Sequence, residues 1–184
     1  METVTGTMTF PMSEESSPDS KVLIRTVKDD EENTETLWAT SLGNDLYRLE
    51  NSPFFAYDVS WKDIVLAQPE GEHHYPTFQR VVEKSGNRTI RVIFEEPLNE
   101  GGVAGRINQA LNSLGLTYEG ANGRYLSYNI PPNVNLDQVT SILNGQPFEW
   151  EYADPSYETL NAQPYAGQVE VKSQKSWLKR LFKQ

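Results

Sequence analysis

The hydrophobic period changes near residue 89, and this change constrains the fold more than any other feature of the chain. Before it, β-branched and aromatic residues alternate with polar ones in short runs that Gly, Pro, Asn and Asp separate. The runs are 22–27, 36–40, 46–50, 63–67 and 77–83. Short strands with tight turns over about sixty residues are typical of a small barrel. We therefore predict a small N-terminal β-barrel over residues 21–88.

The second half of the chain combines both periods. Residues 90–94 alternate as a strand, and the apolar residues of 107–114 and 136–143 fall at helical spacing. A hairpin pattern over 116–130 and a final alternating run over 148–152 complete the order strand, helix, strand, strand, helix, strand. This βαββαβ order is the ferredoxin-like pattern. We predict such a module over residues 89–154, and hence an α+β fold class for the whole chain.

Both ends of the chain differ from these two modules. Residues 1–20 carry four acids and neither Lys nor Arg, which predicts a disordered acidic N-terminus. Residues 155–184 are predicted to be a tail that ends in a short basic amphipathic segment. In that segment, Trp177, Leu178, Leu181 and Phe182 fall on one face if it is helical, and four cations surround them. A segment this short favours docking on the chain itself or on a partner over stable membrane insertion.

Composition and motifs exclude several functions. The chain has no cysteine, so we expect neither disulfides nor thiol catalysis. Its net charge of -10 disfavours general nucleic-acid binding and favours a basic partner. His73 and His74 stand outside any nucleophile or metal motif, and the glycines of 101–105 match no phosphate-binding pattern. We therefore expect no enzyme activity, no metal and no cofactor. The start of the chain carries no signal-peptide pattern, which predicts a cytoplasmic protein.

Acidic and aromatic side chains are the predicted partner-binding residues. Glu149 and Glu151 alternate with aromatic residues, so they project from one face of a strand beside Asp154. Such an acidic patch can steer a basic partner, and exposed rings can anchor it. Among the aromatic residues of 38–61, we expect Trp38, Tyr47 and Phe54 in the barrel core. The predicted partner-binding set is Glu149, Glu151, Asp154, Glu95, Glu96, Tyr57 and Trp61.

One stretch carries a family resemblance. Residues 47–57 read Tyr-Arg-Leu-Glu-Asn-Ser-Pro-Phe-Phe-Ala-Tyr, and shorter matching runs surround them. From about residue 21 to residue 152 the chain resembles a bacterial family known as a domain of unknown function, DUF4265. The family name implies no activity and no catalytic residues. Its association with small acidic immunity partners of bacterial toxins implies a binding function.

The leading hypothesis is a non-catalytic bacterial immunity protein that binds a cognate protein toxin and occludes its basic active-site cleft. An RNA- or ribosome-associated regulatory module is the alternative, and it requires Arg80, Arg88, Arg91 and Arg124 to gather on one surface. A hydrolase that uses His73 or His74 is a third hypothesis, and it requires a polar pocket around those residues. The oligomeric state is left open by the sequence.

Overall fold

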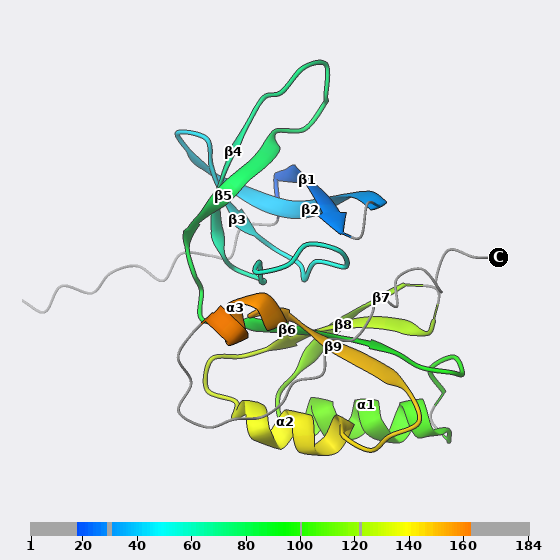
Figure 1. Cartoon of the computed structure of the whole chain (residues 1–184). Coiled ribbons are helices and arrows are strands. Elements are labelled where there is room, and N and C mark those ends of the chain that lie inside the picture. Colours follow the sequence, from blue (N-terminus) through cyan, green and yellow to red (C-terminus); the bar gives the residue numbers. More distant parts are fainter. Residues whose placement is uncertain (1–17, 29–30, 100, 122, 163–184) are drawn as a thin grey trace, which may run out of the picture.

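The molecule consists of a β-barrel stacked on a four-stranded sheet, with two helices on the opposite face of that sheet (Figure 1). It is known from a computed structural model that describes residues 18–28, 31–99, 101–121 and 123–162. The α+β fold class and both predicted architectures are confirmed. The sheet is thus the middle of three layers, and each of its faces meets a different part of the chain.

The barrel is formed by five strands in chain order. These are β1 (Ser20–Lys28), β2 (Glu31–Gly43), β3 (Leu46–Leu49), β4 (Ile64–Gln68) and β5 (Thr77–Glu83). Neighbouring strands are antiparallel, and β1 pairs with β5 in parallel at Leu23 and Thr77 to close the barrel. The β2–β3 turn needs left-handed backbone at Gly43, whose φ is +82°, and glycine adopts this conformation at little cost.

Inward-facing residues of each strand fill the barrel. The side chains buried there are Val22, Ile24, Leu37, Ala39, Leu49, Ala56, Val59, Val65 and Ala67. The expectation that Trp38 joins them is wrong, because Trp38 lies one residue from Leu37 and therefore points outward, where half of it is exposed. Its ring lies against the ammonium group of Lys21, 4.2 Å away, on the neighbouring strand.

The second module has the predicted ferredoxin-like topology. Its elements are β6 (Arg88–Ile93), α1 (Val103–Ser113), β7 (Thr117–Ala121), β8 (Tyr125–Ile130), α2 (Leu136–Leu143) and β9 (Glu149–Asp154). The sheet order is β7-β8-β6-β9, with every neighbouring pair antiparallel. The side chain of Asn135 accepts a 2.8 Å hydrogen bond from the backbone N–H of Asp137, so Asn135 is the N-cap of α2.

Strand periodicity sorts the sheet residues between its two covered faces. Ile90, Val92, Leu126 and Tyr128 are buried in the core under α1 and α2, and the aromatic side chains of β9 pack at its border. The alternate residues of the same strands point to the barrel, and most of them are polar or charged, whereas Ile93 packs with Phe54, Phe55 and Tyr125. Every residue of β8 is buried, on both faces of the sheet. The barrel therefore covers one face of this strand as fully as the helices cover the other.

The structure departs from the sequence prediction at the start of the predicted tail. A short helix, α3 (Tyr157–Ala162), follows β9 directly and lies on the barrel side of the sheet (Figure 1). The hydroxyl of Ser156 accepts a hydrogen bond from the N–H of Thr159 and so caps this helix. The rest of the predicted tail, with its basic amphipathic segment, and residues 1–17 of the predicted disordered N-terminus lie outside the described residues. None of the helices in the described ranges is both long and apolar enough to cross a membrane.

Candidate functional site

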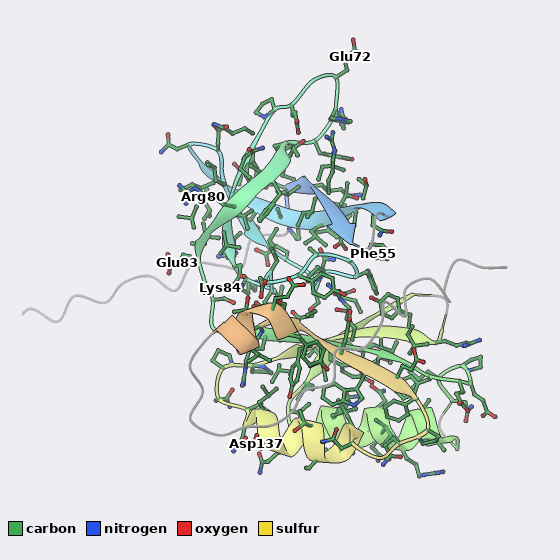
Figure 2. The ribbon with its side chains drawn as sticks, in the orientation of Figure 1. Phe55, Glu72, Arg80, Glu83, Lys84 and Asp137 are labelled. Carbon is green, nitrogen blue, oxygen red and sulfur yellow. The ribbon has the colours of Figure 1, made fainter. Side chains whose placement is uncertain are left out.

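The loop between β3 and β4, residues 50–63, is the part of the barrel that covers the sheet. One carboxylate shapes this loop: Glu35 accepts hydrogen bonds from the backbone N–H groups of Phe54, Phe55 and Ala56, at 2.7–2.9 Å. In Figure 2, Phe55 accordingly lies between the two modules. The loop is therefore held from the barrel side by three hydrogen bonds that do not involve the sheet.

A buried ion pair stands where this loop meets the sheet. Arg91 on β6 is fully buried, and its Nη1 lies 3.2 Å from Oε1 of Glu151 on β9. Its Nη2 donates to the carbonyl oxygen of Ala56, and its guanidinium carbon lies 4.6 Å from the ring centre of Tyr57. The hydroxyl of Tyr57 donates to both oxygens of Glu151, at 2.8 and 2.9 Å. Burial, and next the charge of Glu151, raise the pKa of Tyr57 well above its ordinary value.

A second polar cluster closes the other end of the interface, where Lys84 links the two modules (Figure 2). Its ammonium group donates to Asp63 at 3.0 Å, to Asp154 at 2.8 Å and to the carbonyl oxygen of Asp58. The hydroxyl of Ser60, in the barrel loop, donates to the same oxygen of Asp154 at 2.6 Å. Asp154 therefore stabilises the contact between the modules through two barrel residues.

The exposure expected for part of the predicted site is wrong. Glu151 is only 3% exposed and Asp154 only 6%, because the barrel loop covers the face of the sheet that they share. Tyr57 and Trp61 are half-buried, and the indole N–H of Trp61 is enclosed. Glu151, Asp154 and Tyr57 belong to the contact between the modules, so the predicted residues do not form one open acidic patch.

The three remaining predicted residues come together at one end of the sheet. Glu95 and Glu149 line an open hollow of about 400 Å³, and Glu95 and Glu96 line a smaller one of about 110 Å³, which shares lining residues with the first. We call this pair of cavities the acidic hollow. Its other principal lining residues are Phe94, Pro147, Phe148 and Arg124. Glu95 and Glu96 are exposed, and Glu149 is half-buried.

The acidic hollow combines charge with an apolar floor. Phe94 and Phe148 contact each other edge to face, with ring centres 4.9 Å apart, and they form part of the helix-side core. Arg124 is the cation in the lining, and its Nε donates to the carbonyl oxygen of Phe94 at 3.0 Å. Three carboxylates against one guanidinium leave a formal charge of about -2 around the hollow. This arrangement suits a cation that carries an aliphatic or aromatic side chain beside it.

Comparison with known proteins places the chain in a family. The model of a domain of unknown function, DUF4265, matches residues 35–152. The chain belongs to the DUF4265 family. The chain is also similar in structure to a hypothetical protein from Neisseria gonorrhoeae, with a TM-score of 0.65 and 19% sequence identity over 78% of this chain and 99% of the other. At this identity, the similarity concerns the fold alone. No curated protein matches the sequence.

The structure of this DUF4265 protein separates the arginines that the RNA hypothesis requires on one surface. Arg91 is buried between the modules, and Arg88 donates to the carbonyl oxygens of Pro131 and Val134. Arg80 lies on the outside of the barrel (Figure 2), whereas Arg124 lines the acidic hollow at the end of the sheet. That part of the alternative hypothesis is therefore wrong.

The histidine hypothesis gains no geometric support either. His73 and His74 are exposed on the loop between β4 and β5, where His73 is hydrogen-bonded to the guanidinium of Arg25. The structure places them in none of the hollows described above. In the part of the chain that the structure describes, no three metal-ligating side chains cluster.

Sequence reasoning missed four groups that hold the DUF4265 modules together: Glu35, Asp58, Asp63 and Lys84. It had assigned Arg91 to a different surface. The sequence did contain one signal for Arg91, because an arginine between Ile90 and Val92 interrupts an apolar strand. In the structure, Arg91 stands directly opposite Glu151 on the neighbouring strand. Asp58 gave no comparable signal, since its hydrogen bonds to Ser156 and Thr159 join residues about a hundred positions apart.

Proposed function

We propose that this chain is a non-catalytic bacterial immunity protein that acts in the cytoplasm and binds a cognate protein toxin through the acidic hollow. The observation that carries the proposal is the gathering of Glu95, Glu96 and Glu149 around an open hollow with an aromatic floor.

Electrostatics supports a basic partner. The chain carries a net charge of -10, and opposite charges on two proteins raise their association rate by roughly 10- to 1000-fold at low salt. A toxin that cleaves nucleic acid or nucleotides has a basic cleft for its substrate. The carboxylates of the hollow would pair with those cations and keep the substrate out of the cleft.

The apolar floor adds an anchor to this electrostatic recognition. Residues that dominate binding energy fill well-packed pockets near the centre of an interface, and a polar rim surrounds them. Phe94, Pro147 and Phe148 form such a floor, and Glu95 and Glu149 stand at its rim. A lysine or arginine of the toxin could lay its aliphatic part on the rings and place its charge beside the carboxylates.

The proposal is tested by co-expression with the product of the adjacent gene. We expect the two proteins to co-purify and the chain to restore growth of cells that express the toxin. The variant Glu95→Lys/Glu96→Lys should weaken the complex at least about tenfold. Glu72→Lys/Glu83→Lys changes the charge equally on the barrel, far from the hollow (Figure 2), and should bind as the native chain does.

Two results would contradict this function. If the native chain forms no complex and restores no growth, the immunity role fails. If the Glu95/Glu96 and Glu72/Glu83 variants weaken the complex equally, the partner senses overall charge and the hollow is not its binding site.

A further inference from the structure

The acidic hollow is complementary to a segment of its own chain. Residues 175–184, which lie outside the described ranges, contain four cations and no acid, with Trp177, Leu178, Leu181 and Phe182 among them. We propose that this C-terminal segment docks in the acidic hollow of the same molecule. The inference goes beyond the proposed function, because it does not require a toxin or any other partner.

Charge complementarity is the first argument. The hollow has three carboxylates and one guanidinium, and no described cation forms an ion pair with Glu95 or Glu96. The segment brings Lys175, Lys179, Arg180 and Lys183. The apolar side chains of the segment would pack on Phe94 and Phe148 in the floor of the hollow. The segment can therefore form both ion pairs and apolar contacts with the hollow.

Reach is the second argument. β9 runs from Glu149 at the hollow to Asp154, a length of about 20 Å, and the six residues of α3 add about 9 Å at most. Pro155 and Ser156, between the two elements, add up to about 7 Å, so the end of α3 at Ala162 is within about 36 Å of the hollow. Residues 163–174 can span up to about 40 Å when extended, which is enough to bring the segment there.

Tethering is the third argument, because it lowers the affinity that docking needs. A segment joined to its binding site through a short linker has an effective concentration on the order of millimolar. An intrinsic dissociation constant below about 1 mM would therefore keep the hollow occupied most of the time. A few exposed ion pairs with one or two buried apolar side chains are sufficient for such weak binding.

The chain offers a direct test because it contains no cysteine. A nitroxide spin label on Ser176→Cys in the full chain should broaden the amide NMR signals of residues 93–96, Gln146, Phe148 and Glu149. The signal of Glu72, at the end of the barrel farthest from the sheet, should stay sharp (Figure 2). The isolated protein is used without any partner, so a failure here is distinguishable from a failure of the proposed function, which co-expression decides.

Charge reversal makes the test specific. Glu95→Lys/Glu96→Lys should abolish the broadening at the hollow, and Glu72→Lys/Glu83→Lys should leave it unchanged. Combining Glu95→Lys/Glu96→Lys with Lys179→Glu/Arg180→Glu should restore at least half of it, since the attraction is then re-formed with reversed signs.

Three outcomes would overturn the inference. The first is the absence of broadening at the hollow, and the second is stronger broadening elsewhere on the molecule. The third is broadening that disappears when labelled protein is diluted with an excess of unlabelled protein, because the segment would then dock on a second copy.

Discussion

Glu149 and Glu151 lie on one strand, two residues apart, and on the same face of the sheet, yet their surroundings differ completely. Glu149 stands half-buried at the edge of the acidic hollow. Glu151 is enclosed by the guanidinium of Arg91 and the hydroxyl of Tyr57. Glu149 thus lines an open hollow, whereas Glu151 is part of the protein interior.

This difference shows that the reach of the barrel loop decides the environment of each carboxylate. The loop of residues 50–63 covers the sheet from Arg91 to Asp154 and leaves the end with Glu149 open. A buried carboxylate needs a charged partner and hydrogen bonds to offset the loss of water, whereas an exposed one does not. The comparison therefore predicts different responses to the same chemical change at the two positions.

The largest effect is expected from neutralising the buried carboxylate. Glu151→Gln leaves the guanidinium of Arg91 buried without its countercharge, so the free energy of unfolding should fall by about 3–5 kcal/mol. Glu149→Gln, the matched change two residues away, should cost less than about 1 kcal/mol. Urea unfolding of both variants measures the difference. Equal losses would mean that burial does not separate the two carboxylates.

A somewhat smaller effect is expected at Lys84, whose side chain is partly exposed although its carboxylate partners are buried. Lys84→Met leaves Asp63 and Asp154 without their shared cation and should lower the free energy of unfolding by about 1–3 kcal/mol. The double variant Lys84→Met/Asp154→Asn should recover part of the loss, because it removes one of the charges left uncompensated. Thermal unfolding at one ionic strength compares the two. No recovery would show that Lys84 stabilises mainly through the carbonyl of Asp58.

Removing the hydroxyl of Tyr57 should have a moderate effect that depends on pH. At pH 7, Tyr57→Phe should cost about 1–2 kcal/mol, since Glu151 loses a hydrogen-bond donor. The native protein should lose stability above about pH 10, because tyrosines of the unfolded chain then release protons that folded Tyr57 retains. The decline should be shallower in Tyr57→Phe. Urea unfolding from pH 7 to 11 measures both slopes, with the exposed Tyr118→Phe as the control.

The smallest effect on stability is expected at the acidic hollow. Glu95→Lys/Glu96→Lys alters two exposed side chains and should change the free energy of unfolding by less than about 0.5 kcal/mol per substitution. The same variant should lose the partner and the C-terminal segment. Chemical unfolding in parallel with the binding assays checks the separation. A large loss of stability would show that Glu95 and Glu96 stabilise the fold, and would contradict their proposed role in binding.

Most of the fold could be predicted from the sequence because its periodicities are local. The strand patterns of the barrel, the helical stripes of 107–114 and 136–143 and the N-cap at Asn135 each depend on residues close together in the chain. The helix α3 was missed because six residues hold less than two turns, too few for a stripe. Only the cap at Ser156 and Thr159 marked its start.

The candidate site could be predicted only in part. Alternating Glu and aromatic residues in β9 correctly indicated two chemically different faces. The same alternation is expected whether the acidic face meets water or a second module with a buried arginine. The choice between these depends on contacts such as Tyr57 with Glu151, which join residues 94 positions apart and leave no local pattern.

The contacts of Asp58 also have a consequence for synthesis on the ribosome. Asp58 is translated 98 residues before Ser156, whose N–H it accepts. At about 5–20 residues per second, Asp58 is synthesised roughly 5–20 s before Ser156. Throughout that interval the polar groups of the loop must stay hydrated, and the hydrogen bonds that Glu35 accepts from the backbone N–H groups of the loop would hold its shape.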